Sequence, residues 1–322
     1  MPLEIKDLSK RYGSKWVLRD VEFTAVEGRV LGILGGTASG KSTLLGILAG
    51  HTRDNGGSAV LDGTDLLKVR PKERAVTMLP ERSKTPVIGL FAPKPHASAG
   101  EAILGGFEET LAGAGKIVLL DDPFSILDAE LQAHTFEIVR RTARQRDRTV
   151  IIATTNFEQL TDVADDVAIL SQDRIVQIGT PQKVYEEPAC VASAVLTGSA
   201  NLIEARRLSK NDAELPELHT IDGGHRIFAA PTEKSRLGSI HQNVTLCIRP
   251  EQVTMSMGAS FPEDNLLRAV VTGIHFRGAT SIVEFDASGL KIETRAFKVV
   301  GLSLGDDCML GLPPHRLTVL KD

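Results

Sequence analysis

A glycine-rich loop that ends in lysine constrains this chain more than any other feature. Residues 35–43 read GGTASGKST and satisfy the spacing G-x-x-x-x-G-K-[ST]. The apolar run Arg29–Leu34 precedes the loop, and Ser42–Ala49 has the pattern of a helix that Gly50 closes. Glycines allow backbone N–H groups to wrap an anion, and the start of a helix adds partial positive charge. The segment therefore predicts a strand, a phosphate-binding loop and a helix.

The residue types in and near this loop predict binding of a nucleoside triphosphate together with Mg²⁺. Lys41 is expected to meet the β and γ phosphates, and the Ser42 hydroxyl is expected to bind Mg²⁺, which prefers oxygen ligands. The apolar strand Ile117–Leu120 ends in Asp121, whose carboxylate would reach the same cation from a neighbouring strand. The predicted nucleotide-binding residues of the loop are Gly35, Gly36, Thr37, Ala38, Ser39, Gly40, Lys41, Ser42 and Thr43. A glycine-rich turn with an incidental lysine, and a simple strand-end role for Asp121, are the alternatives.

Periodicity around the loop predicts an α/β fold. Two apolar strands, Ile117–Leu120 and Thr149–Thr154, flank the amphipathic segment Ala129–Arg144, as in a parallel sheet covered by helices. The buried side of that segment is expected to carry Leu131, Phe136 and Ile138. Alternating apolar and polar residues predict antiparallel strands at Leu3–Ile5, Val17–Phe23 and Ser58–Leu61.

The last third of the chain has a different pattern. After Gly198 the helical periodicity gives way to short β-rich segments, which predicts a domain boundary near residue 200 and two domains, 1–200 and 201–322. Leu246–Met255 also lines up with Leu310–Val319, with apolar, Pro, apolar and Thr positions in the same order. A duplicated small β unit explains this match, and a chance similarity is the alternative.

Composition excludes several classes of function. The net charge of −4, without a long basic run, argues against a nucleic-acid partner, because such binding relies on Lys and Arg. Three cysteines, Cys190, Cys247 and Cys308, lie far apart without metal-ligand spacing, which favours reduced thiols in a cytosolic protein. No apolar run has the length of a membrane-spanning helix, so any role at a membrane is expected to go through a partner.

Several further segments resemble the ATP-binding subunits of ABC transporters, specifically the importer type that handles sugars, polyols, polyamines or anions and carries a C-terminal TOBE domain. The resemblance covers nearly the whole chain. Its segments are Leu8–Gly13 with Tyr12, the loop and the Asp121 strand described above, Ser125–Asp128, PQKVYEEP at 181–188, Gly198–Asn201 and Ile248–Glu251. It implies a P-loop NTPase core of the ABC ATPase type with an antiparallel β subdomain, followed by an all-β TOBE/OB-like small domain.

The resemblance also implies roles and partners. Tyr12 would stack on the adenine of ATP, with a plain surface tyrosine as the alternative, and Asp128 would belong to a loop that crosses a nucleotide-dependent dimer interface. The chain would bind Mg-ATP, dimerise with a second ABC ATPase subunit and sit on transmembrane permease subunits, peripherally on the inner face of a bacterial cell membrane.

Three departures from the family pattern concern ATP hydrolysis. Asp122 stands where the family places its catalytic Glu, and the side chain that would position the attacking water is one methylene shorter. Thr155 occupies the place of the switch His, which weakens the expected contact with the γ phosphate. Glu81 replaces the expected Gln, so that an acceptor-only carboxylate stands in place of an amide.

Two further departures lie between Glu81 and the Asp121 strand. The signature loop falls on residues 97–101, where Ser98 and Gly100 are kept and would approach a partner's ATP. Ser98 with Glu101 is also an ordinary capping box at a helix start. Sixteen residues separate Glu81 from Ser98, too few for the family's multi-helix subdomain, which normally helps to grip the permease.

These observations leave three hypotheses. The favoured one is an ABC importer subunit that binds ATP but hydrolyses it slowly, paired with an intact partner ATPase rather than with itself. The second is a regulatory or scaffolding protein that uses ATP as a structural ligand. The third is an active ATPase in which Asp122 suffices as general base.

Overall fold

The computed structural model describes residues 2–79, 105, 107–108, 111–113, 115–125, 127–145, 147–208, 215–233, 235–237, 239–258 and 265–321. The chain divides into two compact units, Met1–Glu186 and Glu187–Asp322. A separate cluster of buried hydrophobic residues fills each unit. The division falls earlier than the boundary predicted near residue 200, because the helix α6 (Val191–Thr197) groups with the second unit.

The first unit is built on a mostly parallel sheet. Its described strands have the order β10-β9-β3-β8-β7-β6, and only β10 at the edge runs antiparallel to its neighbour. Every residue of β3, β7 and β8 is buried, as expected for strands covered on both faces. The bounds are β3 Val30–Leu34, β6 Val76–Leu79, β7 Ile117–Asp121, β8 Thr149–Thr154, β9 Asp166–Ser171 and β10 Arg174–Gly179. The predicted α/β core is confirmed.

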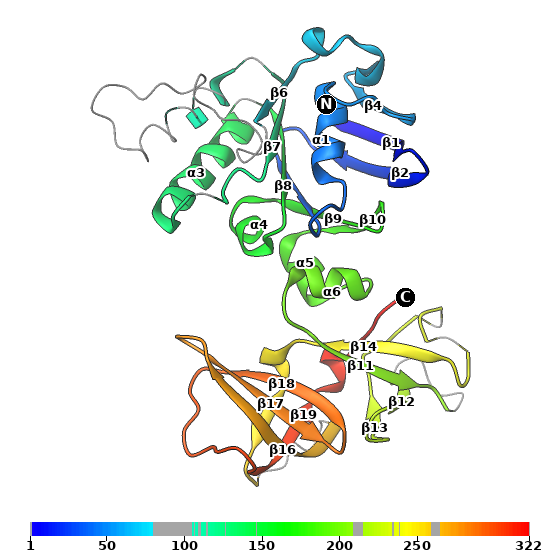
Figure 1. The fold of residues 1–322 in the computed structure, drawn as a ribbon, viewed down its shortest axis with the longest axis vertical. Coiled ribbons are helices and arrows are strands. Elements are labelled where there is room, and N and C mark those ends of the chain that lie inside the picture. The colour runs from blue at the N-terminus through cyan, green and yellow to red at the C-terminus, as the bar shows by residue number, and fades with distance from the viewer. Residues whose placement is uncertain are drawn as a thin grey trace. The chain divides into compact units, whose positions relative to one another are not determined.

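Helices cover both faces of this sheet. Helix α1 (Lys41–Ala49) packs with Leu31 and Ile33, whereas a side chain at Gly32, on the opposite face, would collide with Leu160 of α4 (Phe157–Val163). Helix α3 (Ala129–Gln145) lies on the α4 side, and α5 (Pro181–Glu186) ends the unit. Figure 1 shows α1 between the parallel sheet and the strands β1 and β2. In α3 Phe136 and Ile138 are buried as predicted, while Leu131 is half-buried.

The predicted antiparallel strands form a second sheet in the first unit. Its order is β2-β1-β4-β5, with β1 paired antiparallel to both β2 and β4. The bounds are β1 Leu3–Tyr12, β2 Lys15–Ala25, β4 Gly56–Leu61 and β5 Thr64–Asp65, with short 3-10 turns at Leu66–Lys68 and Pro71–Glu73. The inner face of this sheet packs on α1 through residues such as Leu3, Ile5 and Leu18, which ties it to the core.

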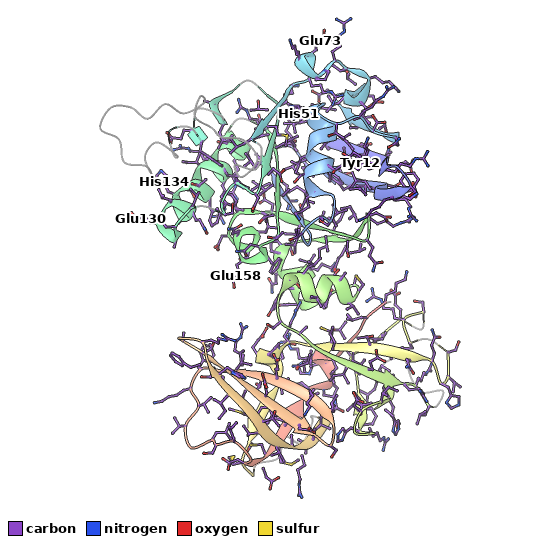
Figure 2. The ribbon with its side chains drawn as sticks, in the orientation of Figure 1. Tyr12, His51, Glu73, Glu130, His134 and Glu158 are labelled. Atoms are coloured by element: carbon purple, nitrogen blue, oxygen red, sulfur yellow. The ribbon has the colours of Figure 1, made fainter. Side chains whose placement is uncertain are left out.

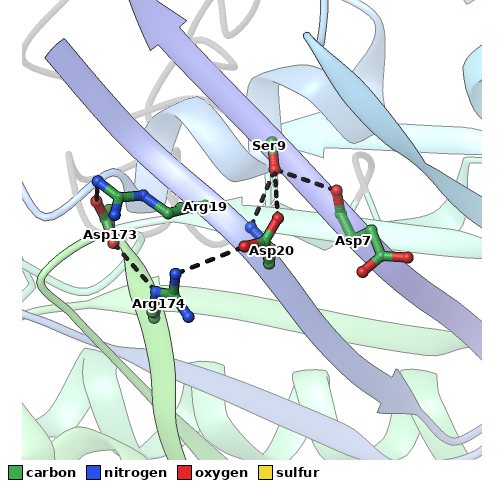
Figure 3. Close-up of polar contacts among 6 residues, drawn as sticks. All are labelled: Asp7, Ser9, Arg19, Asp20, Asp173 and Arg174. Atoms are coloured by element: carbon green, nitrogen blue, oxygen red, sulfur yellow. Dashed lines mark hydrogen bonds and ion pairs between the residues drawn. The ribbon is translucent and has the colours of Figure 1, made fainter.

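A polar network joins the two sheets of the first unit (Figure 3). Arg19 on β2 donates its backbone N–H to the carbonyl oxygen of Asp173 at 2.8 Å and pairs with the Asp173 carboxylate at 3.0 Å. Arg174 reaches back to Asp20 at 3.5 Å, and the Ser9 hydroxyl accepts the backbone N–H of Asp20 at 3.0 Å. Both Asp20 and Asp7 have positive φ, at irregularities in the β1–β2 register. The network holds β1 and β2 to the turn between β9 and β10.

The second unit contains two sheets of the same design. The described strand orders are β13-β12-β11-β14-β20 and β15-β19-β16-β17-β18. The bounds are β11 Asn201–Arg206, β12 Glu217–Thr220, β13 Arg226–Phe228, β14 Asn243–Ile248, β15 Thr254–Ser256, β16 Asn265–Phe276, β17 Ser281–Ala287, β18 Leu290–Ala296, β19 Asp307–Leu312 and β20 Thr318–Val319. The predicted all-β domain is confirmed.

These sheets are copies of one unit that exchange their last strands. Each aligned repeat forms a strand, a short 3-10 turn and a second strand, as β14 with β15 and β19 with β20. Strand β15 pairs with β19, however, and β20 pairs with β14, so each copy completes the sheet of the other. The copies begin at Asn201-Leu202 and Asn265-Leu266, at the same sequence interval as the repeat noted above. The predicted duplication is confirmed and extends over nearly the whole unit.

The two asparagines that begin the copies also have equivalent contacts. The Asn201 side chain donates to the carbonyl oxygen of Glu293 on β18 and accepts its N–H, at 2.8 and 2.7 Å. Asn265 does the same with the backbone of Phe228 on β13, at 2.8 and 2.7 Å. Each asparagine thus satisfies backbone groups on the edge strand of the opposite sheet.

Arg249 connects helix α6 to the β-sheets of the second unit. Its side chain is 2% exposed, and Nη1 donates to the carbonyl oxygens of Ala194 at 2.9 Å and Ser199 at 3.1 Å. Nη2 donates to the Thr197 hydroxyl at 2.7 Å. The last carbonyl groups of a helix have no partner within the helix, so a buried guanidinium satisfies them well. This contact explains why α6 groups with the second unit.

We expect the three cysteines to differ in their reaction with a thiol reagent such as DTNB. All three are free thiols, and Cys190 is half-buried whereas Cys247 and Cys308 are buried. Burial raises the pKa of the Cys247 thiol and of the Cys308 thiol, which lowers their thiolate fraction at neutral pH. Cys190 should therefore be labelled first in the native chain, as peptide mass mapping would show. Equal labelling of all three before denaturation would contradict the buried placement.

Candidate nucleotide-binding site

The predicted phosphate-binding loop opens into a pocket in the first unit. The pocket has a volume of about 580 Å³ and lies at the ends of β3, β7 and β8. Its lining residues are Tyr12, Val17, Thr37, Ala38, Ser39, Gly40, Lys41, Ser42, Thr43, Asp121, Asp122, Thr154 and Thr155. The structure thus brings together residues that are far apart in the sequence and that the motifs single out separately. The carboxyl ends of parallel strands are where ligands of α/β proteins bind.

The backbone of the loop has the conformation that an anion-binding loop needs. Ala38 and Gly40 have φ values of 61° and 104°, in the left-handed region, and Gly40 caps the start of α1. Such local alternation turns consecutive N–H groups toward one point, and the helix start adds positive charge there. A Cβ on Gly40 would lie 2.8 Å from the carbonyl oxygen of Val17, and one on Gly35 would lie 2.6 Å from that of Leu170. Glycine is therefore required at both positions.

Lys41 is held against this loop. Its Nζ donates to the carbonyl oxygens of Gly35 at 2.7 Å and Gly36 at 2.8 Å, and the residue is 9% exposed. A buried ammonium group needs such acceptors, because desolvation penalises an isolated charge. Lys41 therefore places a positive charge beside the loop, and the same ammonium group satisfies two carbonyl oxygens of the loop. Gly35 and Gly36 contribute to the site through these carbonyl groups rather than by lining the pocket.

Two oxygen-bearing side chains in the pocket fit a magnesium ion. Ser42 begins the helix next to Lys41, and Asp121 ends β7 with 5% exposure. Mg²⁺ is usually bound through one or two protein oxygens, with waters and substrate phosphates supplying the rest. Among the described residues no group of three or more His, Cys, Asp or Glu side chains is placed to hold a metal. Ser42 and Asp121 are the residues here that would supply protein oxygens to such an ion.

Asp122 lies beside Asp121 and is tied to β8. Its backbone N–H donates to the carbonyl oxygen of Ala153 at 2.8 Å, and its φ of 45° turns the chain sharply at the strand end. Its Oδ1 lies 3.3 Å from the Thr154 hydroxyl. Thr155 follows Thr154 in the sequence, is exposed, and also lines the pocket. Both residues that replace expected catalytic groups therefore face the same space as the loop.

Tyr12 reaches the pocket from the antiparallel sheet. It ends β1, is 54% exposed and appears in Figure 2 over the edge of that sheet. The ammonium group of Lys10 lies 4.8 Å from the centre of its ring, in a cation–π contact. The network of Figure 3 holds β1 and β2, the strands at whose shared end Tyr12 lies, to the turn between β9 and β10.

Some predicted site residues do not line this pocket. The Asp128 carboxylate accepts the backbone N–H of Leu131 at 2.9 Å and so caps α3, and it is exposed. Its predicted role at a dimer interface concerns a second chain and stays a prediction. Glu81, Ser98 and Gly100, together with Glu101, lie outside the described residues.

Sequence reasoning missed two residues of the pocket wall, Val17 and Thr154. Val17 packs on Gly40 from β2, and nothing in its local pattern distinguishes it from other strand residues. Thr154 is fully buried yet polar, and it ends the apolar strand β8. A polar residue at the carboxyl end of an apolar strand is the signal that could have indicated it, since Asp121 was found in that way.

Comparison with known proteins finds sequence similarity in both units of the chain. The sequence profile of the ABC transporter family matches residues 18–89, and that of the TOBE domain matches residues 246–320. Across 56% of the chain, the structure superposes on a nucleotide-free ATP-binding cassette from an ABC transporter with a TM-score of 0.49 and 17% identity. Among the residues that the structure describes, no helix has both the length and the apolar character to cross a bilayer.

Two of the curated relatives match over almost the full length, and a third matches over about two thirds. The Fe(3+) ions import ATP-binding protein FbpC of Photorhabdus laumondii is 25% identical over 99% of this chain and 97% of its own length. The spermidine/putrescine import ATP-binding protein PotA of Mesoplasma florum is 25% identical over 92% and 93%. The putrescine transport ATP-binding protein PotG of Escherichia coli is 31% identical over 63% of each chain. With a phosphate-binding loop in the first unit and a TOBE match in the second, the chain is similar to ABC transporter ATP-binding proteins that carry a C-terminal TOBE domain.

Proposed function

We propose that this chain is the ATP-binding subunit of an ABC importer and that it binds Mg-ATP in the pocket at the phosphate-binding loop. The observation that carries the proposal is the convergence of Tyr12, Lys41 and Asp121 with the loop on one pocket. Relatives that align with almost the whole chain are named as import ATP-binding proteins, which supports the importer assignment.

The pocket suggests how each part of Mg-ATP would be held. The loop N–H groups and Lys41 would bind the phosphates, and Tyr12 would offer the face of its ring that Lys10 leaves uncovered to adenine. Ser42 and Asp121 would hold Mg²⁺, which when bound neutralises charge on the phosphates. Every one of these residues lies in the first unit, so this unit would contain all the chain's own contacts to the nucleotide.

Hydrolysis by the isolated chain is proposed to be slow. Asp122 would accept the proton of the attacking water, but its carboxylate is one methylene shorter than the expected Glu, and Thr155 stands in place of a His. A displacement of a reacting group by ~1 Å can lower a rate by ~10²-fold. A shorter acid that β8 holds rigidly has little freedom to close that gap.

The proposed setting is a complex at the inner face of the cell membrane. The chain would pair with a second ABC ATPase subunit, more readily a different subunit than a second copy, and would dock on permease subunits. In a mixed pair the departures at Asp122 and Thr155 would affect only the site that this chain's loop builds. In a pair of identical chains they would affect both sites.

We expect steady-state ATP hydrolysis by the purified chain to be about 100-fold slower than by ABC ATPase subunits with the usual Glu. The measurement is phosphate release with saturating Mg-ATP, alongside calorimetric binding of Mg-ATP to the same sample. Asp122→Asn should remove the residual turnover, and Asp122→Glu should raise it. If the chain binds Mg-ATP and hydrolyses it as fast as those subunits do, the proposal of slow hydrolysis is wrong.

Co-purification of the chain with its natural partners decides between the transport and the regulatory hypotheses. Co-purification of the chain with permease subunits is expected if it drives import, and their addition should stimulate hydrolysis. A complex with proteins that have no membrane-spanning segments would instead favour the regulatory hypothesis, in which ATP serves as a structural ligand.

A further inference from the structure

Thr154 connects the phosphate-binding loop to Asp122. Its backbone carbonyl oxygen accepts the N–H of Gly35 at 3.4 Å, at the start of the loop. Its hydroxyl lies 3.3 Å from Oδ1 of Asp122, which follows the neighbouring strand β7. The residue has no exposed surface, so water does not compete for these contacts. Removal or reorientation of the Thr154 hydroxyl would therefore change the hydrogen bonding of Asp122.

Three groups surround that hydroxyl, but it carries a single proton. The backbone N–H of Asn156 donates to Thr154 Oγ1 at 3.1 Å. Asp122 Oδ1 and the Gln159 side-chain amide, with Oε1 facing the hydroxyl at 3.1 Å, are the other two neighbours. A hydroxyl donates one hydrogen bond and accepts two. It therefore cannot donate to Asp122 and to Gln159 Oε1 together.

The two possible directions of the proton have different effects on Asp122. If the hydroxyl donated to Gln159, its lone pairs would face the Asp122 carboxylate and repel it. A half-turn of the Gln159 amide exchanges its oxygen and nitrogen within the same space. Gln159 then donates to Thr154, and Thr154 donates to Asp122. In that arrangement the Thr154 hydroxyl accepts from Asn156 and Gln159 and donates to Asp122, so the carboxylate gains a hydrogen bond.

We infer that Gln159 and Thr154 form a directed hydrogen-bond chain that positions Asp122, with the Gln159 amide nitrogen as its first donor. Gln159 is 7% exposed on α4, so its side chain is largely enclosed by the protein. With Oδ1 held by Thr154, Oδ2 of Asp122 is left to receive a proton from the water. Among the described residues Oδ2 accepts no hydrogen bond that would compete with it.

This role rests on the proposed function, because it concerns hydrolysis in the same pocket. In the step, the water oxygen bonds to the γ phosphorus while the bond from that phosphorus to the β–γ bridging oxygen breaks. The water proton passes to the Asp122 carboxylate, and ADP and phosphate result. Thr154 and Gln159 touch neither water nor nucleotide in this scheme, so they are positioning residues.

The test compares variants of the full chain that differ in one hydrogen-bonding group. Thr154→Val keeps the side-chain size but removes the donor, and we expect kcat to fall at least tenfold while KM and calorimetric affinity for Mg-ATP change less than twofold. Thr154→Ser should restore most of kcat. Gln159→Glu replaces the amide donor with an acceptor that takes the Thr154 proton, so it should lower kcat as Thr154→Val does, and the double variant should be no slower than Thr154→Val.

A matched control and a second measurement separate this inference from the proposed function. Thr161→Val removes a hydroxyl from the same helix, where it bonds only to the carbonyl oxygen of Glu158 among the described residues, and should leave kcat unchanged. Neutron diffraction from the deuterated full chain should place the Thr154 deuteron on the line to Asp122. A deuteron directed at Gln159, or an unchanged kcat in both Thr154→Val and Gln159→Glu, overturns the inference even if Mg-ATP binds. Absence of Mg-ATP binding overturns the proposed function, while the deuteron position still decides the hydrogen-bond direction.

Discussion

Replacing Lys41 with alanine is expected to weaken the binding of Mg-ATP by more than about 100-fold. A hydrogen bond to a charged group contributes ~1.5–3 kcal/mol, and Lys41 would make such bonds to two phosphates. The same ammonium group now joins the carbonyl oxygens of Gly35 and Gly36, so its removal also loosens the loop. Isothermal calorimetry with Mg-ATP measures both the loss of affinity and the loss of binding heat.

Lys72→Ala provides the control for this experiment. Lys72 is exposed in the Pro71–Glu73 turn and does not line the pocket, yet its replacement removes the same charge from the first unit. Its affinity for Mg-ATP should equal that of the parent chain. Equal affinity in Lys41→Ala would mean that the loop does not bind the phosphates, and the nucleotide-binding proposal would be lost.

Replacing Arg249 with methionine is expected to destabilise the second unit by about 4 kcal/mol. Methionine fills similar volume but leaves the carbonyl oxygens of Ala194 and Ser199, and the Thr197 hydroxyl, without their donor. Each buried polar group left unsatisfied costs ~1–3 kcal/mol. Helix α6 should lose its attachment, because these contacts lie at its carboxyl end.

Urea unfolding can assign this loss to the second unit. The single tryptophan, Trp16, lies in the first unit, so its fluorescence reports that unit, whereas circular dichroism reports both. In Arg249→Met the dichroism should show a transition at lower urea, and the tryptophan transition should not move. Arg226→Met is the control, since Arg226 forms an exposed pair with Glu217 at 2.7 Å and should cost less than ~1 kcal/mol. Equal effects of the two variants would contradict the anchoring role of Arg249.

Local patterns in the sequence predicted β1–β4, α1, β7, α3 and β8 of the first unit, but not β6, β9, β10, α4 or α5. Strand β8 has the predicted bounds, and β3, β7 and α1 differ from their predictions by one residue at an end. These segments carry an uninterrupted apolar run or a glycine boundary, which depends only on neighbouring residues. Strand order is a different matter, because the pairing of β3 with both β8 and β9 joins segments far apart in the chain.

In the candidate site, too, features set by neighbouring residues could be predicted and features set by distant residues could not. The loop residues and Asp121 could be predicted because their chemistry is written in contiguous motifs. The roles of Thr154 and Gln159 depend on the direction of a side chain toward another strand, which no local pattern records. Arg249 was singled out by resemblance alone, and its buried contact with α6 depends on folding of the second unit.

The exchange of β15 and β20 imposes an order of events on synthesis of the chain. When the ribosome has made the first copy, its sheet still lacks the edge strand that Thr318 and Val319 will supply. The second copy in turn needs β15, which was made long before its partner β19. Neither copy completes its sheet by itself, so the β unit gains its last strand pairings only after its final strand has emerged.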